Sequence, residues 1–156
     1  MLSDRQSGVS LIETLVALAI VSIGLLGVTT LHLVSIQQSV SSLNHSQAVW
    51  LAYDMADRIR VNGTAFASYA GMNTDNDYQQ DCLNSDCDPA QMVTADAAEW
   101  SEKLQGLPSG QGIIIGDANG LELRVLWDDE NTGAKGTDCG PDPDRDLTCY
   151  RITLLP

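Results

Sequence analysis

The feature that most constrains this sequence is an apolar segment close to its N-terminus. The 21 residues from Thr14 to Val34 are uncharged and mostly apolar. As a helix with a rise of about 1.5 Å per residue, the segment spans ~31 Å, which matches the hydrocarbon core of a bilayer. A small soluble domain cannot cover a helix that is apolar on every side. The sequence therefore predicts a single membrane-spanning helix.

The rest of the chain is strongly acidic. The 156 residues include 21 Asp and Glu against 8 Lys and Arg, which gives a formal net charge of −13. Residues 72–156 alone hold 17 acidic and 5 basic residues, a net charge of −12. Binding to nucleic acid or to anionic lipid depends on Lys and Arg, so this balance argues against both functions.

A secretory signal peptide is the main alternative for the apolar segment. Its hydrophobic region is about 7–15 residues long and ends at a cleavage site of the Ala-x-Ala type. Here the apolar run is longer, and residues 32–44 contain no Ala-x-Ala. We therefore expect the segment to stay in the mature protein, and N-terminal sequencing would distinguish it from a soluble secreted protein.

Glu13 is the one charged residue inside the apolar block that begins at Val9. A carboxylate in a bilayer costs about 2.5–3.5 kcal/mol on insertion scales unless it is paired or near the interface. A cut after Gly8 would give Val9 an α-amine at the same depth, and that amine on a neighbouring subunit would neutralise Glu13. The alternative is an interfacial position with no role.

The string GVSLIETLVAL, residues 8–18, resembles the prepilin signature of type IV pilins and type II secretion pseudopilins. The resemblance implies that a prepilin peptidase cuts between Gly8 and Val9 and that the new N-terminus is methylated. It also implies that Glu13 sets the axial register by pairing with a neighbour's N-terminus. The continuation SIGLLG, residues 22–27, resembles the PilV-type branch of minor pilins.

The helix is expected to continue beyond the membrane, because no Gly lies between Gly27 and Gly63 and no Pro occurs before Pro89. Apolar residues recur at helical spacing, and we expect them to pack on a sheet. They are Ile36, Val40, Leu43 and Trp50, and again Val49, Ala52, Ala56 and Ile59. The predicted organisation is a leader of residues 1–8, a helix of residues 9–61 with residues 9–35 in the membrane or filament core, and a head of residues 62–156.

The head is expected to contain a polar loop over residues 72–91, a short helix over residues 96–104 and three strands. Residues 112–115, 121–127 and 149–155 show strand patterns separated by turn signals. This order resembles the type IV pilin fold. The predicted fold class is therefore α+β and pilin-like, with a long N-terminal helix packed on a small antiparallel sheet.

All four cysteines lie in the head, on the expected extracytoplasmic side: Cys82, Cys87, Cys139 and Cys149. An even number there predicts two disulfides, with three connectivities open. Closing each local pair, 82–87 and 139–149, is the simplest. The two spacings, C-x₄-C and C-x₉-C, do not favour a zinc site.

Neither a catalytic site nor a metal or cofactor site is predicted. Asp142, Asp144 and Asp146 alternate as at the start of a calcium loop, but an EF-hand needs Gly and Glu where this chain has Leu147 and Thr153. The head contains no His to serve a nucleophile, and nothing in it gathers the groups that an enzyme needs. We predict a non-enzymatic protein without a cofactor.

The resemblance implies a minor pilin that is inserted in the inner membrane as a single-pass precursor with a periplasmic head. After cleavage it would enter a type IV pilus and prime assembly. Its implied partners are other major and minor pilins, prepilin peptidase and the inner-membrane pilus assembly machinery, and no nucleic acid. The alternatives are a pilus-tip adhesin or calcium-binding module and a type II secretion minor pseudopilin.

Overall fold

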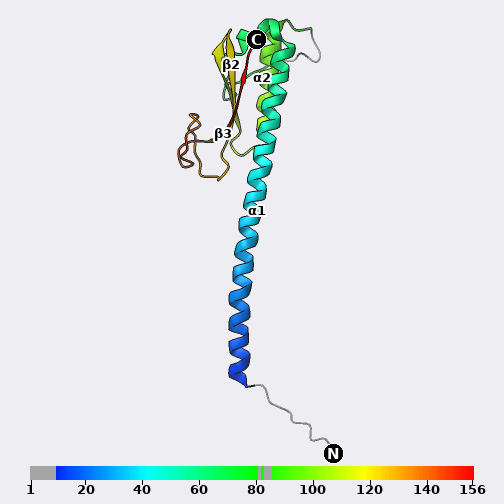
Figure 1. Ribbon diagram of the computed structural model, residues 1–156. Helices are drawn as coiled ribbons and strands as arrows, with labels where there is room; N and C mark the ends of the chain where they lie inside the picture. The colour runs from blue at the N-terminus through cyan, green and yellow to red at the C-terminus, as the bar shows by residue number, and fades with distance from the viewer. Residues whose placement is uncertain (1–9, 81, 83–85) are drawn as a thin grey trace, which may run out of the picture. The chain divides into compact units, whose positions relative to one another are not determined.

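A computed structural model describes residues 10–80, 82 and 86–156 of the chain. The elements follow in the order α1 (Leu11–Val61), the 3-10 helix η1 (Gly63–Tyr69), α2 (Pro89–Leu104), β1 (Gln111–Asp117), β2 (Gly120–Trp127) and β3 (Thr148–Leu154) (Figure 1). The chain divides into two compact units, Met1–Val40 and Ser41–Pro156. We call them the helical unit and the globular unit, and each is described by itself.

Helix α1 contains 51 residues and ends at Val61, where the Asn62-Gly63 stop signal predicts its end. Arg58 and Arg60 lie in its last turn, where cations offset the negative end of the helix dipole. The predicted first residue of the helix, Val9, lies outside the described residues. The long helix expected from the sequence is thus confirmed from Leu11 onward.

The sheet is antiparallel with the strand order β1-β2-β3. Leu123 of β2 lies between Ile114 of β1 and Ile152 of β3, and these three residues face the core. Arg124, the next residue of β2, lies opposite Arg151 of β3 on the other face. The alternation of apolar and charged residues in the sequence predicts this arrangement, because successive side chains of a strand point to opposite faces.

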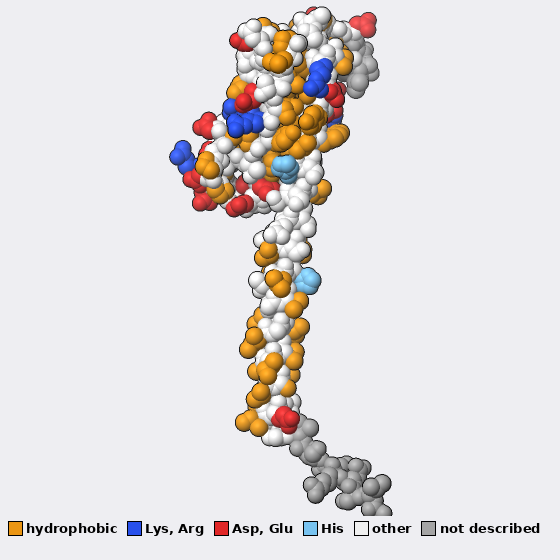
Figure 2. Space-filling model, viewed as in Figure 1, with side chains coloured by type: hydrophobic (Ala, Val, Ile, Leu, Met, Phe, Trp, Pro, Cys, Tyr) orange, Lys and Arg blue, Asp and Glu red, His pale blue; other side chains and the backbone are white. Residues whose placement is uncertain are grey.

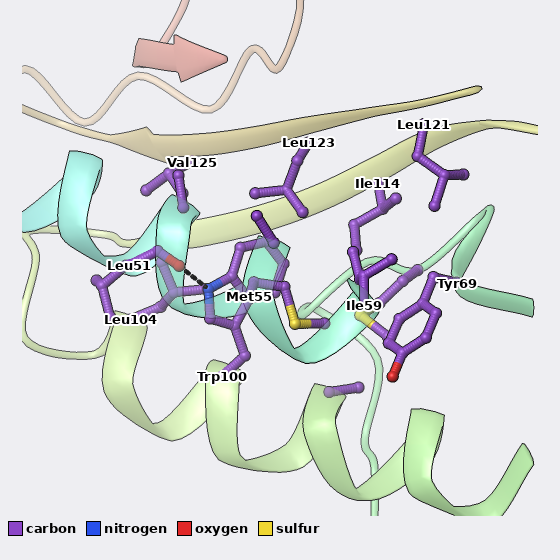
Figure 3. Packing of buried hydrophobic residues seen from close by; sticks show 14 of the residues in the cluster. Leu51, Met55, Ile59, Tyr69, Trp100, Leu104, Ile114, Leu121, Leu123 and Val125 are labelled. Carbon is purple, nitrogen blue, oxygen red and sulfur yellow. Dashed lines mark hydrogen bonds between the residues drawn. The ribbon is translucent and has the colours of Figure 1, made fainter. Parts of the chain in front are cut away.

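The core of the globular unit lies between the sheet, α2 and the C-terminal half of α1 (Figure 3). The Trp100 side chain is fully buried, and its Nε1 donates a hydrogen bond of 3.1 Å to the Leu51 carbonyl oxygen. The ring packs so closely on β1 that a Cβ at Gly112 would lie 2.3 Å from it. Gly112 therefore allows the tryptophan of α2 to lie against the strand.

The loop predicted over residues 72–91 is wrong at its C-terminal end, and at its N-terminal end it is a loop that pairs with the sheet. At its C-terminal end α2 already begins at Pro89, because Asp88 caps it: the Asp88 carboxylate accepts from Gln91 N, and the Gln91 side chain accepts from Asp88 N. At its N-terminal end the segment Gly71–Thr74 pairs with the outer edge of β1. Such pairing is non-local, so no pattern of adjacent residues reveals it.

One predicted apolar stripe of α1 is not buried. Its members are exposed, and they are Ile36, Val40, Leu43 and Trp50. The buried face instead carries Ala48, Ala52 and Ala56 beside larger residues: Leu51, Met55 and Ile59. Three alanines at a spacing of four leave room for the sheet and α2 to come close, and the larger residues fill the remaining space.

The prediction of two disulfides is confirmed. Cys82 is joined to Cys87, and Cys139 is joined to Cys149. This is the local pairing among the three connectivities that the sequence leaves open. The second bridge ties the loop between β2 and β3 to the start of β3.

Candidate assembly site

The helical unit presents an apolar surface that nothing in its own described residues covers. On the face shown in Figure 2, apolar side chains run along the whole segment. All 14 large apolar side chains between Leu11 and Val34 are exposed. They are Leu11, Ile12, Leu15, Val16, Leu18, Ile20, Val21, Ile23, Leu25, Leu26, Val28, Leu31, Leu33 and Val34. Burial of such a side chain is worth about 1.5–3 kcal/mol. A surface of this size requires lipid or other protein around it.

Three hydroxyl groups of the same segment find partners within the helix itself. The hydroxyl of Ser22 donates to the Leu18 carbonyl at 2.7 Å, and that of Thr29 donates to the Leu25 carbonyl at 2.8 Å. Thr30 makes the same type of bond over 3.0 Å, one turn back along the helix. These hydroxyls are satisfied within the helix, so they do not oppose an apolar environment.

Gly24 and Gly27 lie in this surface, and no close contact with another described residue requires a glycine at either position. A Cβ built at either residue would meet nothing within 4 Å, apart from the helix's own neighbouring backbone. Each Gly costs a helix about 1 kcal/mol relative to Ala. Their use therefore points to something outside the chain, such as a closely approaching helix, or to a locally looser helix.

Of the three predicted assembly residues, only Glu13 is described. It lies in the first turn of α1, where its backbone N donates to the Ser10 carbonyl at 3.0 Å. Its carboxylate has neither a hydrogen bond nor an ion pair with the rest of the described chain. The predicted processing residues Gly8 and Val9 lie outside the described residues, so their geometry stays a prediction.

In the globular unit, Arg58 joins the end of α1 to α2. Its guanidinium donates to Asp96 at 2.9 Å and to Glu99 at 2.7 Å, and its Nε lies 3.4 Å from Asp54. Burial lowers the pKa of Arg58, but the hydrogen bonds to Glu99 and Asp96 outweigh it and the net shift is upward. The guanidinium therefore stays charged and holds the two helices together.

The buried Tyr69 of η1 completes this network. Its hydroxyl donates to the second oxygen of Asp96 at 2.5 Å. Burial, and then the bond to this carboxylate, raise the pKa of Tyr69 above its ordinary range. Sequence reasoning missed the network, although the i, i+4 pair of Asp54 and Arg58 on α1 was a signal for part of it.

Asp129 ties the end of β2 to α1. Its carboxylate accepts from Ser41 Oγ at 2.5 Å, from Trp127 Nε1 at 2.9 Å and from Asn44 Nδ2 at 3.1 Å. Burial raises the pKa of Asp129, but the hydrogen bonds from Ser41, Trp127 and Asn44 bring it below its ordinary value. The preceding Asp128 points elsewhere and accepts from the backbone of the following loop.

The loop between β2 and β3 is where the sequence places its alternating aspartates, Asp142, Asp144 and Asp146. A hollow of 260 Å³ lies there, lined by one carboxylate, Asp146, and one cation, Arg151, among prolines and the Cys139–Cys149 bridge. The Asp142 carboxylate accepts from Asp144 N within its own turn. The described residues contain no group of three or more His, Cys, Asp or Glu side chains suited to a metal. The calcium-binding alternative thus finds no support in this loop.

By length and composition, α1 is the one helix of the described chain that is long and apolar enough to cross a membrane, and its most apolar window is entirely exposed. Comparison with known families adds two matches. Residues 30–98 match the Tt1218-like family, described as "Type IV pilin Tt1218", and residues 3–29 match the prokaryotic N-terminal methylation motif. The chain has the α+β fold of a type IV pilin. Neither the curated proteins nor the solved structures that were compared give a match.

The two matches meet in the middle of α1. The methylation motif covers the predicted leader from residue 3 onward and most of the exposed apolar segment. The pilin match extends through the buried half of α1 and ends inside α2. The pilin-like fold class predicted from the sequence is thus confirmed. The exposed apolar surface of the helical unit is therefore the part of the described chain to examine for a function.

Proposed function

We propose that the chain is a minor pilin, a non-enzymatic subunit that prepilin peptidase cuts after Gly8 and that enters a type IV pilus through residues 9–35. The observation that carries the proposal is the exposed apolar surface between Leu11 and Val34. In the inner-membrane precursor, with the head in the periplasm, lipid covers this surface. In the filament the helices of other pilins cover it, so one surface serves both states.

In this proposal Glu13 pairs with the α-amine of Val9 on a neighbouring pilin. A carboxylate without a partner in an apolar interior costs several kcal/mol, and an ammonium at the same depth offsets that cost. The amine exists at this position only after the leader is removed. The pairing therefore makes assembly depend on processing and fixes one subunit at a defined height beside the next.

The charge of the chain supports the role of a minority subunit that primes assembly. The leader contains one acid, Asp4, and one base, Arg5, so the mature chain keeps the net charge of −13. Identical acidic heads packed side by side repel one another within the Debye length of about 8 Å at physiological ionic strength. Dispersing the copies among less acidic pilins removes this repulsion, as a position in a priming or tip complex would do.

The decisive test compares Glu13→Gln with Thr14→Val, a matched change at the next residue of the same helix. We expect both variants to be cleaved and to insert in the membrane. Glu13→Gln should be depleted about tenfold from sheared pili, which corresponds to ~1.4 kcal/mol of lost pairing, whereas Thr14→Val should not. Normal recovery of the glutamine variant in pili would contradict the pairing.

Mass spectrometry tests processing separately from pairing. We expect the mature protein to begin at Val9, to carry a methyl group there and to contain no free thiol. Gly8→Val should leave the precursor uncut, because the peptidase must reach a backbone without a side chain at that position. A mature wild-type chain that still begins at Met1 would contradict the whole proposal, whatever the behaviour of Glu13 variants.

The N-terminal signature is shared with type II secretion pseudopilins, which keeps a minor pseudopilin as the second candidate. The two candidates are separated by deleting the gene for this chain in a strain that otherwise retains both the pilus and the secretion system. Loss of surface pili with normal protein secretion indicates the pilus, and the opposite result indicates the secretion system.

A further inference from the structure

The two outer edges of the sheet are treated differently. The edge of β1 is covered by the segment Gly71–Thr74: Gly71 N donates to Ile114 O, and Ile114 N donates to Met72 O, both at 2.9 Å. Thr74 N donates to Gly112 O at 2.9 Å, and Gly112 N donates to the Thr74 hydroxyl at 2.8 Å. Every backbone group that β1 directs outward between Gly112 and Ile114 thus has a partner.

The edge of β3 has no such cover. No backbone hydrogen bond joins its outer side to any other part of the described chain. The strand runs for seven residues, from Thr148 to Leu154, without a proline or a bulge in its register with β2. The Cys139–Cys149 bridge lies at one end only. An open edge of this length is a template for pairing with another strand.

The side chains of β3 carry the same asymmetry. Ile114 of the covered strand is fully buried, whereas Tyr150 and Ile152 of β3 are only partly buried, although they pack against the same core. Tyr53 of α1, which interacts with Tyr150, is 49% exposed. A strand added along β3 would cover this apolar margin as the segment Gly71–Thr74 covers that of β1.

Charge selects the occupant of the edge. At the midpoint of β3, Arg151 is exposed and makes neither an ion pair nor a side-chain hydrogen bond within the described chain, while Arg124 opposite it pairs with Glu122 at 2.6 Å. Like charges directly opposite each other on a sheet are unfavourable, and an opposite charge is favourable. A carboxylate on a strand added outside β3, opposite Arg151, would therefore offset the repulsion between Arg151 and Arg124.

A second copy of this chain is a poor occupant. In the antiparallel self-pairing that uses the whole strand, Arg151 at its midpoint meets Arg151 of the other copy, beside the Arg124 of each. The two chains also carry a net charge of −13 each. Both the local and the overall electrostatic terms oppose the dimer.

We propose that β3 is a recognition edge that receives an extended strand of a different protein, with an acidic residue opposite Arg151 and apolar residues facing Tyr150 and Ile152. Backbone hydrogen bonds supply most of the affinity, and the carboxylate fixes the register. This interaction surface does not depend on the role of the helical unit, so it can be tested without a filament.

The test uses the full chain in detergent micelles and two synthetic peptides, Thr-Thr-Val-Glu-Val-Thr-Thr and its twin with Lys in place of Glu. Amide chemical shifts and hydrogen exchange are measured by NMR at β3, with β1 as the internal control. We expect the Glu peptide to shift and protect amides of β3 and to bind about tenfold more tightly than the Lys peptide. Arg151→Glu should reverse this preference.

Lys135→Glu is the matched charge control, because Lys135 is exposed on the loop between β2 and β3 and changes the net charge by the same amount. It should keep the preference for the Glu peptide. The proposal is wrong if the Glu peptide leaves the β3 amides unchanged or shifts another surface instead. It is equally wrong if Arg151→Glu keeps the preference, or if the chain alone forms a dimer that protects β3.

Discussion

Between Leu11 and Val34 all large apolar side chains of α1 are exposed, whereas between Asn44 and Ile59 seven residues of the same helix are buried. The first segment consists mainly of Leu, Ile and Val on all sides. The second has alanines and larger apolar residues on its buried face, and polar residues together with Trp50 and Tyr53 among its exposed ones. Apolar content alone therefore does not decide burial within the chain. A helix with an apolar stripe of limited width packs that stripe on its own sheet. A helix that is apolar on all sides must be covered by lipid or by other protein.

The largest expected effect comes from removing the centre of the buried region. Trp100→Ala deletes a fully buried side chain and removes the hydrogen bond that its Nε1 donates to the Leu51 carbonyl. We expect a loss of about 3–5 kcal/mol in the free energy of unfolding of the globular unit. Denaturant-dependent hydrogen exchange of the β2 amides in detergent measures it. Leu18→Ala, in the exposed region, should leave the same exchange unchanged. An equal loss of stability in both variants would show that the exposed segment supports the globular core as much as the buried one does.

A smaller effect is expected where the buried half of α1 meets α2. Asp96→Asn removes the charge that Arg58 and Tyr69 share, although Glu99 and Asp54 still neutralise part of the arginine. We expect a destabilisation of about 2 kcal/mol, measured by the same exchange method. Tyr69→Phe should cost less, about 1 kcal/mol, because it leaves the ion pair intact. A neutral result for Asp96→Asn would show that the network does not hold the helices together.

Acid should weaken the contact that fixes α1 to the end of β2. Because the folded pKa of Asp129 is below its ordinary value, its contribution to stability is complete above the unfolded pKa of about 3.9 and is lost as the pH falls toward the folded pKa. Asp129→Asn should therefore be less stable than the parent at pH 6. The difference in melting temperature between the two should shrink below about pH 4. A constant difference from pH 6 to pH 3 would refute this.

The smallest effect on the globular unit is expected from changes in the exposed apolar segment of α1. The double change Gly24→Ala and Gly27→Ala adds two methyl groups where the chain itself offers open space. The melting temperature of the globular unit should not change, because the two added methyl groups lie in the helical unit and not in the globular core. If the glycines serve a closely packed neighbour, recovery of the variant in sheared pili should fall while its membrane level stays normal. A shift in the melting temperature would contradict the expectation that these glycines do not affect the globular unit.

Local patterns in the sequence predict much of this fold because each depends on neighbouring residues. The end of α1 follows from Asn62-Gly63, and β2 follows from the alternation between Leu121 and Trp127. Patterns failed where long-range pairing decided the result, as with the segment Gly71–Thr74 on β1. They also failed at Trp50, since several faces of α1 carry apolar residues and only packing selects the buried one.

The sequence by itself determined that the chain has an apolar N-terminal helix with one carboxylate near its start and an acidic head with four cysteines, because composition and spacing are properties of the chain alone. Only the tertiary structure decided which face of α1 is buried, that Asp96 joins Arg58 to Tyr69, and that the edge of β1 is covered while that of β3 is open. These features depend on which distant segments meet, and packing and hydrogen bonding between such segments are settled by the whole fold.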